Sequence, residues 1–132
     1  MAVFIDTSAI FAMLDADDRH HEAASAGWKT LAERREPSLC SNYVLVECFA
    51  LLGRRLGHDA VRAFQTQIVP VLQVNWVTET VHERAVAALL TAGSQSLSLV
   101  DCVSFELMRE LGIDRAFAFD AHFAEQGFRP IS

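Results

Sequence analysis

The amino-acid sequence predicts one α/β domain, with a central and mostly parallel sheet of about five short strands flanked by helices. Short apolar runs that suit buried strands alternate along the chain with longer segments of helical periodicity. The chain has 132 residues, of which 52% are hydrophobic and 21% charged, so it can build one core but not two. We therefore expect residues 1–132 to form a single domain.

In the first half of the chain, turn-forming and capping residues separate the expected elements. Thr7 or Ser8 can cap the first helix, Pro37 stops the second, and Gly57 ends the third. The expected elements are strands over residues 3–5 and 38–40, and helices over residues 7–14, about 19–35 and 42–56.

The second half continues the alternation. Val61, Phe64 and Ile68 recur at helical spacing, and Gly112 is a typical residue just beyond a helix end. The expected helices cover residues 58–68, 79–90 and 99–111, with a short turn of helix at 121–126. Strands are expected over residues 71–77, 115–119 and 128–131, and a serine-rich turn over 93–98. Because right-handed crossovers bring the carboxyl ends of parallel strands to one rim, a ligand is expected at that rim.

The net charge limits the possible partners. Seventeen acidic residues outnumber 11 basic ones, giving a formal charge of −6, which argues against nucleic-acid binding through a broadly basic surface. All of the basic side chains except Lys29 are arginines, which can hold phosphate bidentately, so a few placed contacts to RNA stay possible. An excess of acid also suits a cation site.

Three cysteines, Cys40, Cys48 and Cys102, form no CxxC pair, so neither a disulfide framework nor a zinc site is expected. The N-terminal residues lack a basic segment, and the longest apolar stretch, 43–52, is too short to span a bilayer. We expect a cytoplasmic protein that does not enter a membrane.

Four carboxylates stand in apolar surroundings. Asp6 and Asp120 each follow an expected strand, Asp101 opens a helix, and Glu47 is the one residue that is not apolar between Tyr43 and Leu52. A buried carboxylate without a partner costs several kcal/mol or takes up a proton. Gathered at one rim, these oxygen ligands suit Mg²⁺ or Mn²⁺, which can activate water next to a phosphate.

Each acid also has a purely structural interpretation. Ser98 and Asp101 have the spacing of a capping box, Asp120 can cap the short helical turn, and Asp6 can form an Asx turn. Glu47 is harder to explain in this way, since a surface glutamate does not need apolar neighbours on every side.

The remaining candidates are weaker. His20 and His21 follow an acidic loop and could bind metal, although a solvated helix start is favoured. His122 lies two residues after Asp120 and could assist chemistry, although a surface or capping role is favoured. Arg54 and Arg55 either complement the dipole at the end of their helix or contact phosphate near the cleft. The tryptophans and phenylalanines are expected in the core.

Taken together, these residues resemble the PIN-domain family, and in particular its VapC toxins from bacterial toxin–antitoxin pairs. The resemblance begins with Val3-Phe4-Ile5-Asp6-Thr7-Ser8, continues through Glu47 and Ser98-Leu99-Val100-Asp101, and closes with Phe119-Asp120-Ala121-His122-Phe123 and Gly127-Phe128. It covers nearly the whole chain. Many relatives have Thr or Ser where this chain has Ala118, which removes one polar contact from the cleft.

The resemblance implies a metal-dependent endoribonuclease. It assigns Asp6 and Asp101 as the principal ligands of Mg²⁺ or Mn²⁺, and Glu47 and Asp120 as the residues that complete the cluster. Thr7 or Ser8 would add a hydrogen bond to the substrate or to Asp6. Metal-activated water would then attack phosphorus in line and leave a 5′-phosphate and a 3′-hydroxyl. The same resemblance implies a homodimer and a small antitoxin of the VapB type as partners.

Other functions compete with this interpretation. Receiver-type signalling domains and haloacid-dehalogenase phosphatases share an acidic, Mg²⁺-binding rim but need a lysine beside the phosphoryl group, and Lys29 lies in an early helix away from the rim. A PIN fold that acts on DNA, or one that is catalytically silent and serves as a binding partner, is the alternative that stays open.

Overall fold

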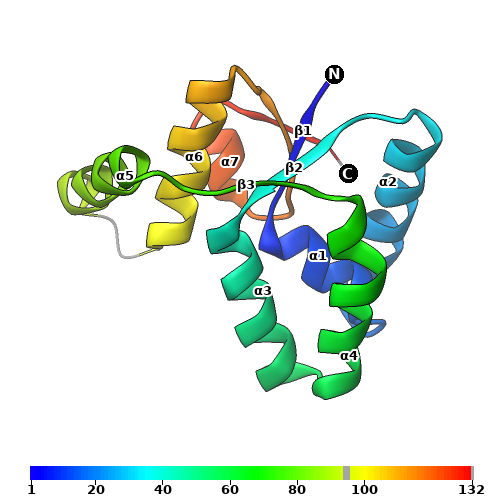
Figure 1. Ribbon diagram of the computed structural model, residues 1–132. Coiled ribbons are helices and arrows are strands. Elements are labelled where there is room, and N and C mark those ends of the chain that lie inside the picture. Colours follow the sequence, from blue (N-terminus) through cyan, green and yellow to red (C-terminus); the bar gives the residue numbers. More distant parts are fainter. Residues whose placement is uncertain (94–95, 132) are drawn as a thin grey trace.

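A computed structural model describes residues 1–93 and 96–131 of the protein. Its centre is a five-stranded sheet in the order β3-β2-β1-β4-β5, in which every neighbouring pair is parallel (Figure 1). The expected parallel α/β architecture is therefore confirmed. The strands are β1 (Val3–Ile5), β2 (Ser38–Ser41), β3 (Gln73–Asn75), β4 (Arg115–Phe117) and β5 (Arg129–Ile131).

Helices cover both faces of this sheet. The chain moves outward from β1 to β3 and then returns to β4 on the other side of β1, so right-handed crossovers place the two groups of helices on opposite faces. Figure 1 shows α2 on one side of the strands and α6 and α7 on the other. The helices are α1 (Thr7–Leu14), α2 (His21–Glu33), α3 (Asn42–Arg55), α4 (His58–Ala63), α5 (Glu79–Ala92), α6 (Leu99–Leu111) and α7 (Ala121–Glu125).

The central strand β1 organises the core. All three of its residues are buried, and Phe4 lies opposite Leu39 in β2 and Ala116 in β4. Apolar side chains from the helices of both faces complete the core around it. The three cysteines are buried and unpaired, and burial raises the pKa of Cys40 to about 12, so this thiol is unreactive. Within the described part of the chain, no helix is long and apolar enough to cross a membrane.

The observed elements differ from the expected ones mainly at their ends. The helix expected over residues 58–68 is α for only its first part and continues as a π-helix (Phe64–Ile68) and a 3-10 turn (Val69–Val71). Pro70, which has no N–H group to donate, lies in that turn. The strand expected over 115–119 ends at Phe117, because the N–H of Phe119 donates to Ser8 Oγ instead of to a neighbouring strand. Residues 94–95 of the expected serine-rich turn lie outside the described residues.

The role of β1 can be tested with Phe4→Ala. The Phe4 side chain is 0% exposed, so its truncation should lower the free energy of unfolding by about 3–5 kcal/mol in a urea titration. Leu90→Ala is the matched control, because Leu90 is 76% exposed and its truncation should change the free energy by less than about 0.5 kcal/mol. Equal losses in the two variants would contradict the central position of Phe4 in the core.

Candidate metal centre and active site

A cleft of about 680 Å³ opens at the carboxyl edge of the sheet. Asp6 follows β1 and Asp120 lies shortly after β4, so adjacent strands deliver these two acids to the same edge. The part of α3 from Glu47 to Arg55 and the first turn of α6 form its other walls. Every site residue predicted from the sequence lines this cleft: Asp6, Thr7, Ser8, Glu47, Arg54, Arg55, Asp101 and Asp120.

Asp6 is fixed at the N-terminus of α1. Its Oδ2 accepts hydrogen bonds from the backbone N–H of Ser8 (3.1 Å) and from the Ser8 hydroxyl (2.6 Å). Ser8 Oγ in turn accepts from the N–H of Phe119 at 2.9 Å, which ties the end of β1 to the loop after β4. The expected contact between Ser8 and Asp6 is therefore present, and it holds this carboxylate in one orientation.

Asp101 is held by the capping box at the start of α6. Its Oδ2 accepts from the N–H of Ser98 at 3.1 Å, and Ser98 Oγ accepts from the N–H of Asp101 at the same distance. The residue is only 9% exposed, yet it lines the cleft. The structural and the functional interpretations of Asp101 are thus compatible, because the cap positions the carboxylate at the edge of the cleft.

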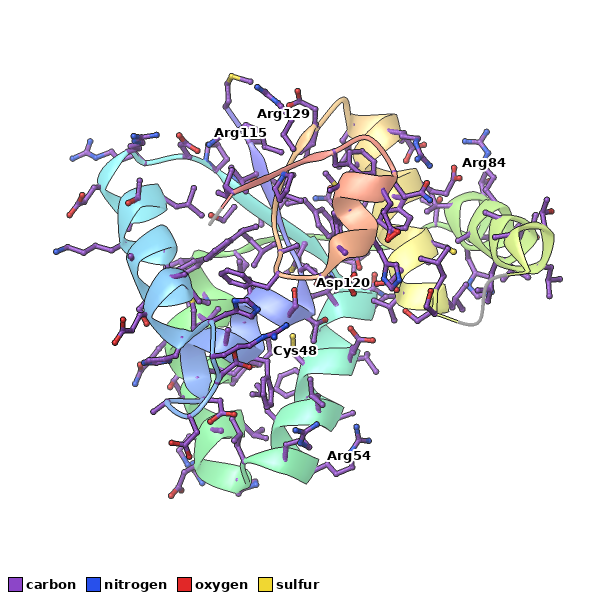
Figure 2. All side chains as sticks on the ribbon, turned by 180° about the vertical axis from the view of Figure 1, so that it is seen from behind. Cys48, Arg54, Arg84, Arg115, Asp120 and Arg129 are labelled. Atoms are coloured by element: carbon purple, nitrogen blue, oxygen red, sulfur yellow. The ribbon has the colours of Figure 1, made fainter. Side chains whose placement is uncertain are left out.

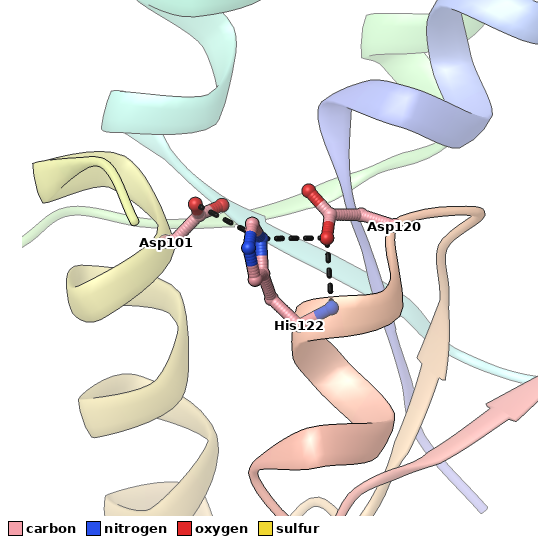
Figure 3. Close-up of side chains that lie close together, drawn as sticks. All are labelled: Asp101, Asp120 and His122. Carbon is pink, nitrogen blue, oxygen red and sulfur yellow. Dashed lines mark hydrogen bonds and ion pairs between the residues drawn. The ribbon is translucent and has the colours of Figure 1, made fainter. Parts of the chain in front are cut away.

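Asp120 caps α7 and contacts His122. Its Oδ1 accepts from the backbone N–H of His122 at 2.8 Å and lies 2.7 Å from the ring Nδ1 of the same residue. Nδ1 is also 3.7 Å from Oδ2 of Asp101, so the imidazole lies between the two carboxylates (Figure 3). The sequence placed His122 at the surface or in a capping role, whereas its side chain is only 20% exposed and its ring faces the acids.

Glu47 comes from the middle of α3, opposite Thr7. The hydroxyl of Thr7 is buried and makes no hydrogen bond of good geometry within the described part of the chain. Thr7 is only 5% exposed and lines the same cleft, and its side chain lowers the pKa of Glu47, as a hydrogen-bond donor does. Thr7 and Glu47 therefore lie close together at the cleft.

Burial and mutual repulsion make Asp6, Glu47 and Asp101 hard to ionise. Burial raises the pKa of Asp6 to about 7, with smaller contributions from the charges of Asp101 and Glu47, although the bonds from Ser8 oppose the shift. Burial also raises the pKa of Glu47 and of Asp101, and in both cases the nearby charge of Asp120 adds to the increase. A divalent cation would offset this repulsion, since all of these groups offer the oxygen ligands that Mg²⁺ and Mn²⁺ prefer.

The arginines extend the cleft away from the acids. Arg54 lies two turns beyond Glu47 on α3, about 10 Å along the helix axis. Figure 2 shows its side chain at the far end of this helix from Asp120. The guanidinium of Arg55 lies 5.5 Å from the centre of the Phe11 ring, which directs it toward the floor of the cleft. The cleft therefore runs from an acidic end to a basic end.

Two further contacts were not predicted from the sequence. The ring of His20 stacks on Phe119 with 4.6 Å between the centroids and an interplanar angle of 14°, and Arg19 lines the cleft beside it. The sequence assigned His20 to a solvated helix start and the phenylalanines to the core. No local pattern connects residues 99 positions apart, so only the fold reveals this aromatic pair beside Asp120.

The fold and the site define a class of protein: a parallel α/β domain with clustered carboxylates at the carboxyl edge of its sheet. The PIN domain model matches residues 3–129, and the chain belongs to the PIN-domain family. The family expected from the sequence is therefore confirmed.

Known proteins agree with this assignment. The chain is 38% identical to the 23S rRNA-specific endonuclease VapC20 of Mycobacterium tuberculosis, over 96% of this chain and 95% of that protein. The crystal structure of VapC20, described as a sarcin–ricin loop cleaving toxin, superposes with a TM-score of 0.85 at 37% identity, again covering 96% and 95% of the two chains. FitAcB from Neisseria gonorrhoeae shares the fold, with a TM-score of 0.71 at 13% identity over 100% of this chain and 97% of that one.

The raised pKa of Asp6 predicts how stability depends on pH without metal. The ordinary value of 3.8 applies to the unfolded chain and about 7 to the folded one, so the folded state holds a proton that the unfolded state releases. The free energy of unfolding should therefore fall as the pH rises from about 4 to 7. Asp6→Asn removes this loss, and the variant should exceed the wild type by about 4 kcal/mol at pH 8, with a difference that shrinks toward pH 4.

Thermal and urea unfolding in the presence of a chelator measure this difference. Asp17→Asn is the matched control, since Asp17 lies in the exposed loop before α2 and outside the cleft. A stability difference between the wild type and Asp6→Asn that stays constant from pH 4 to pH 8 would show that folding does not shift the pKa of Asp6.

Proposed function

We propose that this protein is a metal-dependent endoribonuclease and the toxin of a toxin–antitoxin pair. The observation that carries the proposal is the convergence of four carboxylates from distant parts of the chain on one cleft, with raised pKa values at Asp6, Glu47 and Asp101. Such a site is costly to build without a cation. The near full-length similarity to a 23S rRNA-specific endonuclease supports RNA over DNA as the substrate.

In this proposal Asp6 and Asp101 hold the cation, while Glu47 and Asp120 complete the cluster. Ser8 orients Asp6, and the capping box orients Asp101, so neither carboxylate needs to reorganise when the ion binds. A bound Mg²⁺ or Mn²⁺ lowers the pKa of water and offsets charge that develops on the phosphate. The phosphodiester bond is then hydrolysed to a 5′-phosphate and a 3′-hydroxyl.

The basic end of the cleft would position the RNA. Arg54, Arg55 and Arg19 can neutralise phosphates on either side of the scissile bond, and the stacked pair of His20 and Phe119 offers an aromatic surface to an unpaired base. By similarity to VapC20, we propose the sarcin–ricin loop of 23S rRNA as the target. An exposed RNA loop suits a small acidic protein that makes few, local phosphate contacts.

The proposed partners are a second copy of the chain and a small antitoxin. Apolar side chains remain exposed, including Val46 on α3 at 68% and Trp76 after β3 at 74%. A shallow apolar groove beside Glu47 is formed by Tyr43, Val46, Ala50 and Val100. Exposed apolar surface of this kind is typical of a protein interface and supports at least one protein partner. We expect the complex in the cytoplasm, where its proposed rRNA target is found.

Mapping of RNA 5′ ends tests the activity. Induced expression of the wild type in bacteria should create a discrete new 5′-phosphate end in 23S rRNA, and Asp101→Asn should reduce it at least about 100-fold. Asparagine keeps an oxygen that can accept from Ser98, so the fold should survive. Asp59→Asn, at an exposed acid of α4, should cleave like the wild type.

Three outcomes would argue against this function. Identical RNA 5′ ends for the wild type and Asp101→Asn would contradict a ribonuclease activity at the proposed metal site. Cleavage of single-stranded DNA by purified protein, with RNA left intact, would make the protein a deoxyribonuclease. Purified protein that binds its partner but cleaves neither nucleic acid would be a silent PIN domain.

The role of Arg54 is tested by binding rather than by cleavage. On the cleavage-silent Asp101→Asn background, Arg54→Ala should weaken binding of a sarcin–ricin loop oligonucleotide about fivefold to tenfold. It should also lower the slope of log K against log salt by about 0.7, the value for one phosphate contact on single strands. Arg84→Ala is the matched control, because Figure 2 places Arg84 on α5, away from Asp120 and Arg54. An unchanged salt slope for Arg54→Ala would exclude the phosphate contact.

A further inference from the structure

We infer that His122 is a nitrogen ligand in the cation site, and that it biases the site toward Mn²⁺ over Mg²⁺. The inference rests on the proposed function, since it concerns the same cation, but it adds a residue and a metal preference that the four carboxylates do not imply. It is carried by the position of His122 between two acids and by the direction in which its ring nitrogens point.

The ring nitrogen Nδ1 is in the right place for a ligand. Oxygen atoms of Asp101 and Asp120 and a ring nitrogen of His122 all lie within 4.8 Å of one another, which is compatible with three donors around one ion. Figure 3 shows the imidazole between the two carboxylates, with α6 supplying one acid and the loop before α7 the other. No other group of three such donors occurs among the described residues.

The contacts of Nδ1 are not those of an ordinary hydrogen bond. Nδ1 is buried and lies 2.7 Å from Asp120 Oδ1, yet its geometry toward that oxygen does not satisfy a hydrogen bond. A buried ring nitrogen that lies close to two carboxylates without a hydrogen bond to either has no partner among the described residues. A cation between the three groups would supply that partner by accepting the lone pair of an unprotonated Nδ1.

The contact of the opposite ring nitrogen is compatible with the tautomer that this role requires. Nε2 of His122 lies 3.1 Å from Ser96 Oγ. A neutral imidazole carries one N–H, so donation from Nε2 to the serine oxygen leaves the lone pair on Nδ1. Histidines that bind metals commonly donate their other N–H to an oxygen acceptor in this way.

The backbone holds the ring in place. The N–H of His122 donates to Asp120 Oδ1 at 2.8 Å, so the residue that would share the ion also anchors the histidine at the first turn of α7. His20, the other histidine that lines or borders the cleft, is engaged differently, because its ring stacks on Phe119. Of these two histidines, only His122 therefore has a ring nitrogen beside the carboxylates.

A nitrogen donor changes which ion the site prefers. Mg²⁺ selects oxygen ligands and keeps its waters, whereas imidazole nitrogen suits transition-metal ions better. A purely carboxylate site would discriminate little between Mg²⁺ and Mn²⁺ by ligand type. With His122 as a ligand, the affinity of the site for Mn²⁺ should rise, whereas its affinity for Mg²⁺ should not.

Pulsed electron paramagnetic resonance of Mn²⁺ bound to the full-length protein tests the inference directly. The wild type should show a ¹⁴N coupling of the size given by a directly bound imidazole. His122→Asn, which places an amide oxygen near the position of Nδ1, should still bind Mn²⁺ but lose the coupling. His20→Asn is the matched control and should keep it, because its ring stacks on Phe119.

Affinity provides a second, independent measurement. In equilibrium titrations, His122→Ala should weaken Mn²⁺ binding about tenfold or more and change Mg²⁺ binding by less than about threefold. Circular dichroism and thermal unfolding check that each variant folds. If His122→Ala binds Mn²⁺ as tightly as the wild type, or more tightly, the histidine is a competing positive charge and the inference is overturned.

The outcomes separate this inference from the proposed function. Mn²⁺ bound to the wild type without a ¹⁴N coupling would overturn the nitrogen ligand, while Asp101-dependent cleavage of RNA would still support the ribonuclease. A wild type that binds no Mn²⁺ at all would overturn the inference together with the metal-dependent part of the proposed function.

Discussion

The repulsion among carboxylates gathered at one edge of the sheet is the constraint on which the rest of this site depends. Folding removes Asp6 from water almost completely and brings Glu47 and Asp101 close enough to raise its pKa further. The fold tolerates this because three of the four acids are anchored by a local element: Asp6 and Asp120 cap helices, and Asp101 belongs to a capping box. Helix N-termini favour negative charge, which compensates part of the cost of burial. A bound cation would offset the rest of this cost.

The anchoring interactions also explain why the site is rigid. Ser8 joins Asp6 at the end of β1 to the backbone of Phe119 beyond β4, and this bond ends the strand where the active-site loop begins. His122 is attached to Asp120 through its backbone while its ring reaches Asp101. Metal ligands held before binding need not be ordered by the ion, so binding energy is not lost to reorganisation. The same acids whose burial lowers stability are thus held in fixed orientations that suit cation binding.

The net charge of the chain does not show that acidic and basic side chains line the same cleft. A chain with a formal charge of −6 should repel RNA on average. However, Arg54, Arg55 and Arg19 line the same cleft as the acids, and a cation at the acidic end would offset part of the negative charge there. An acidic protein can therefore bind RNA at one place and avoid it elsewhere, which limits non-specific contacts.

The sequence by itself determined the parallel α/β class, most element positions and the four acids, because these depend on local signals. Apolar runs, capping residues and a carboxylate among apolar neighbours can each be read within about ten residues, as at Glu47. Contacts between residues far apart in the sequence were decided by the tertiary structure alone. The end of β4 is set by Ser8, the stacking of His20 on Phe119 joins the start of α2 to the loop after β4, and the ring of His122 lies 3.7 Å from Asp101. Such contacts require the sheet to assemble first, since no local preference of the chain encodes them.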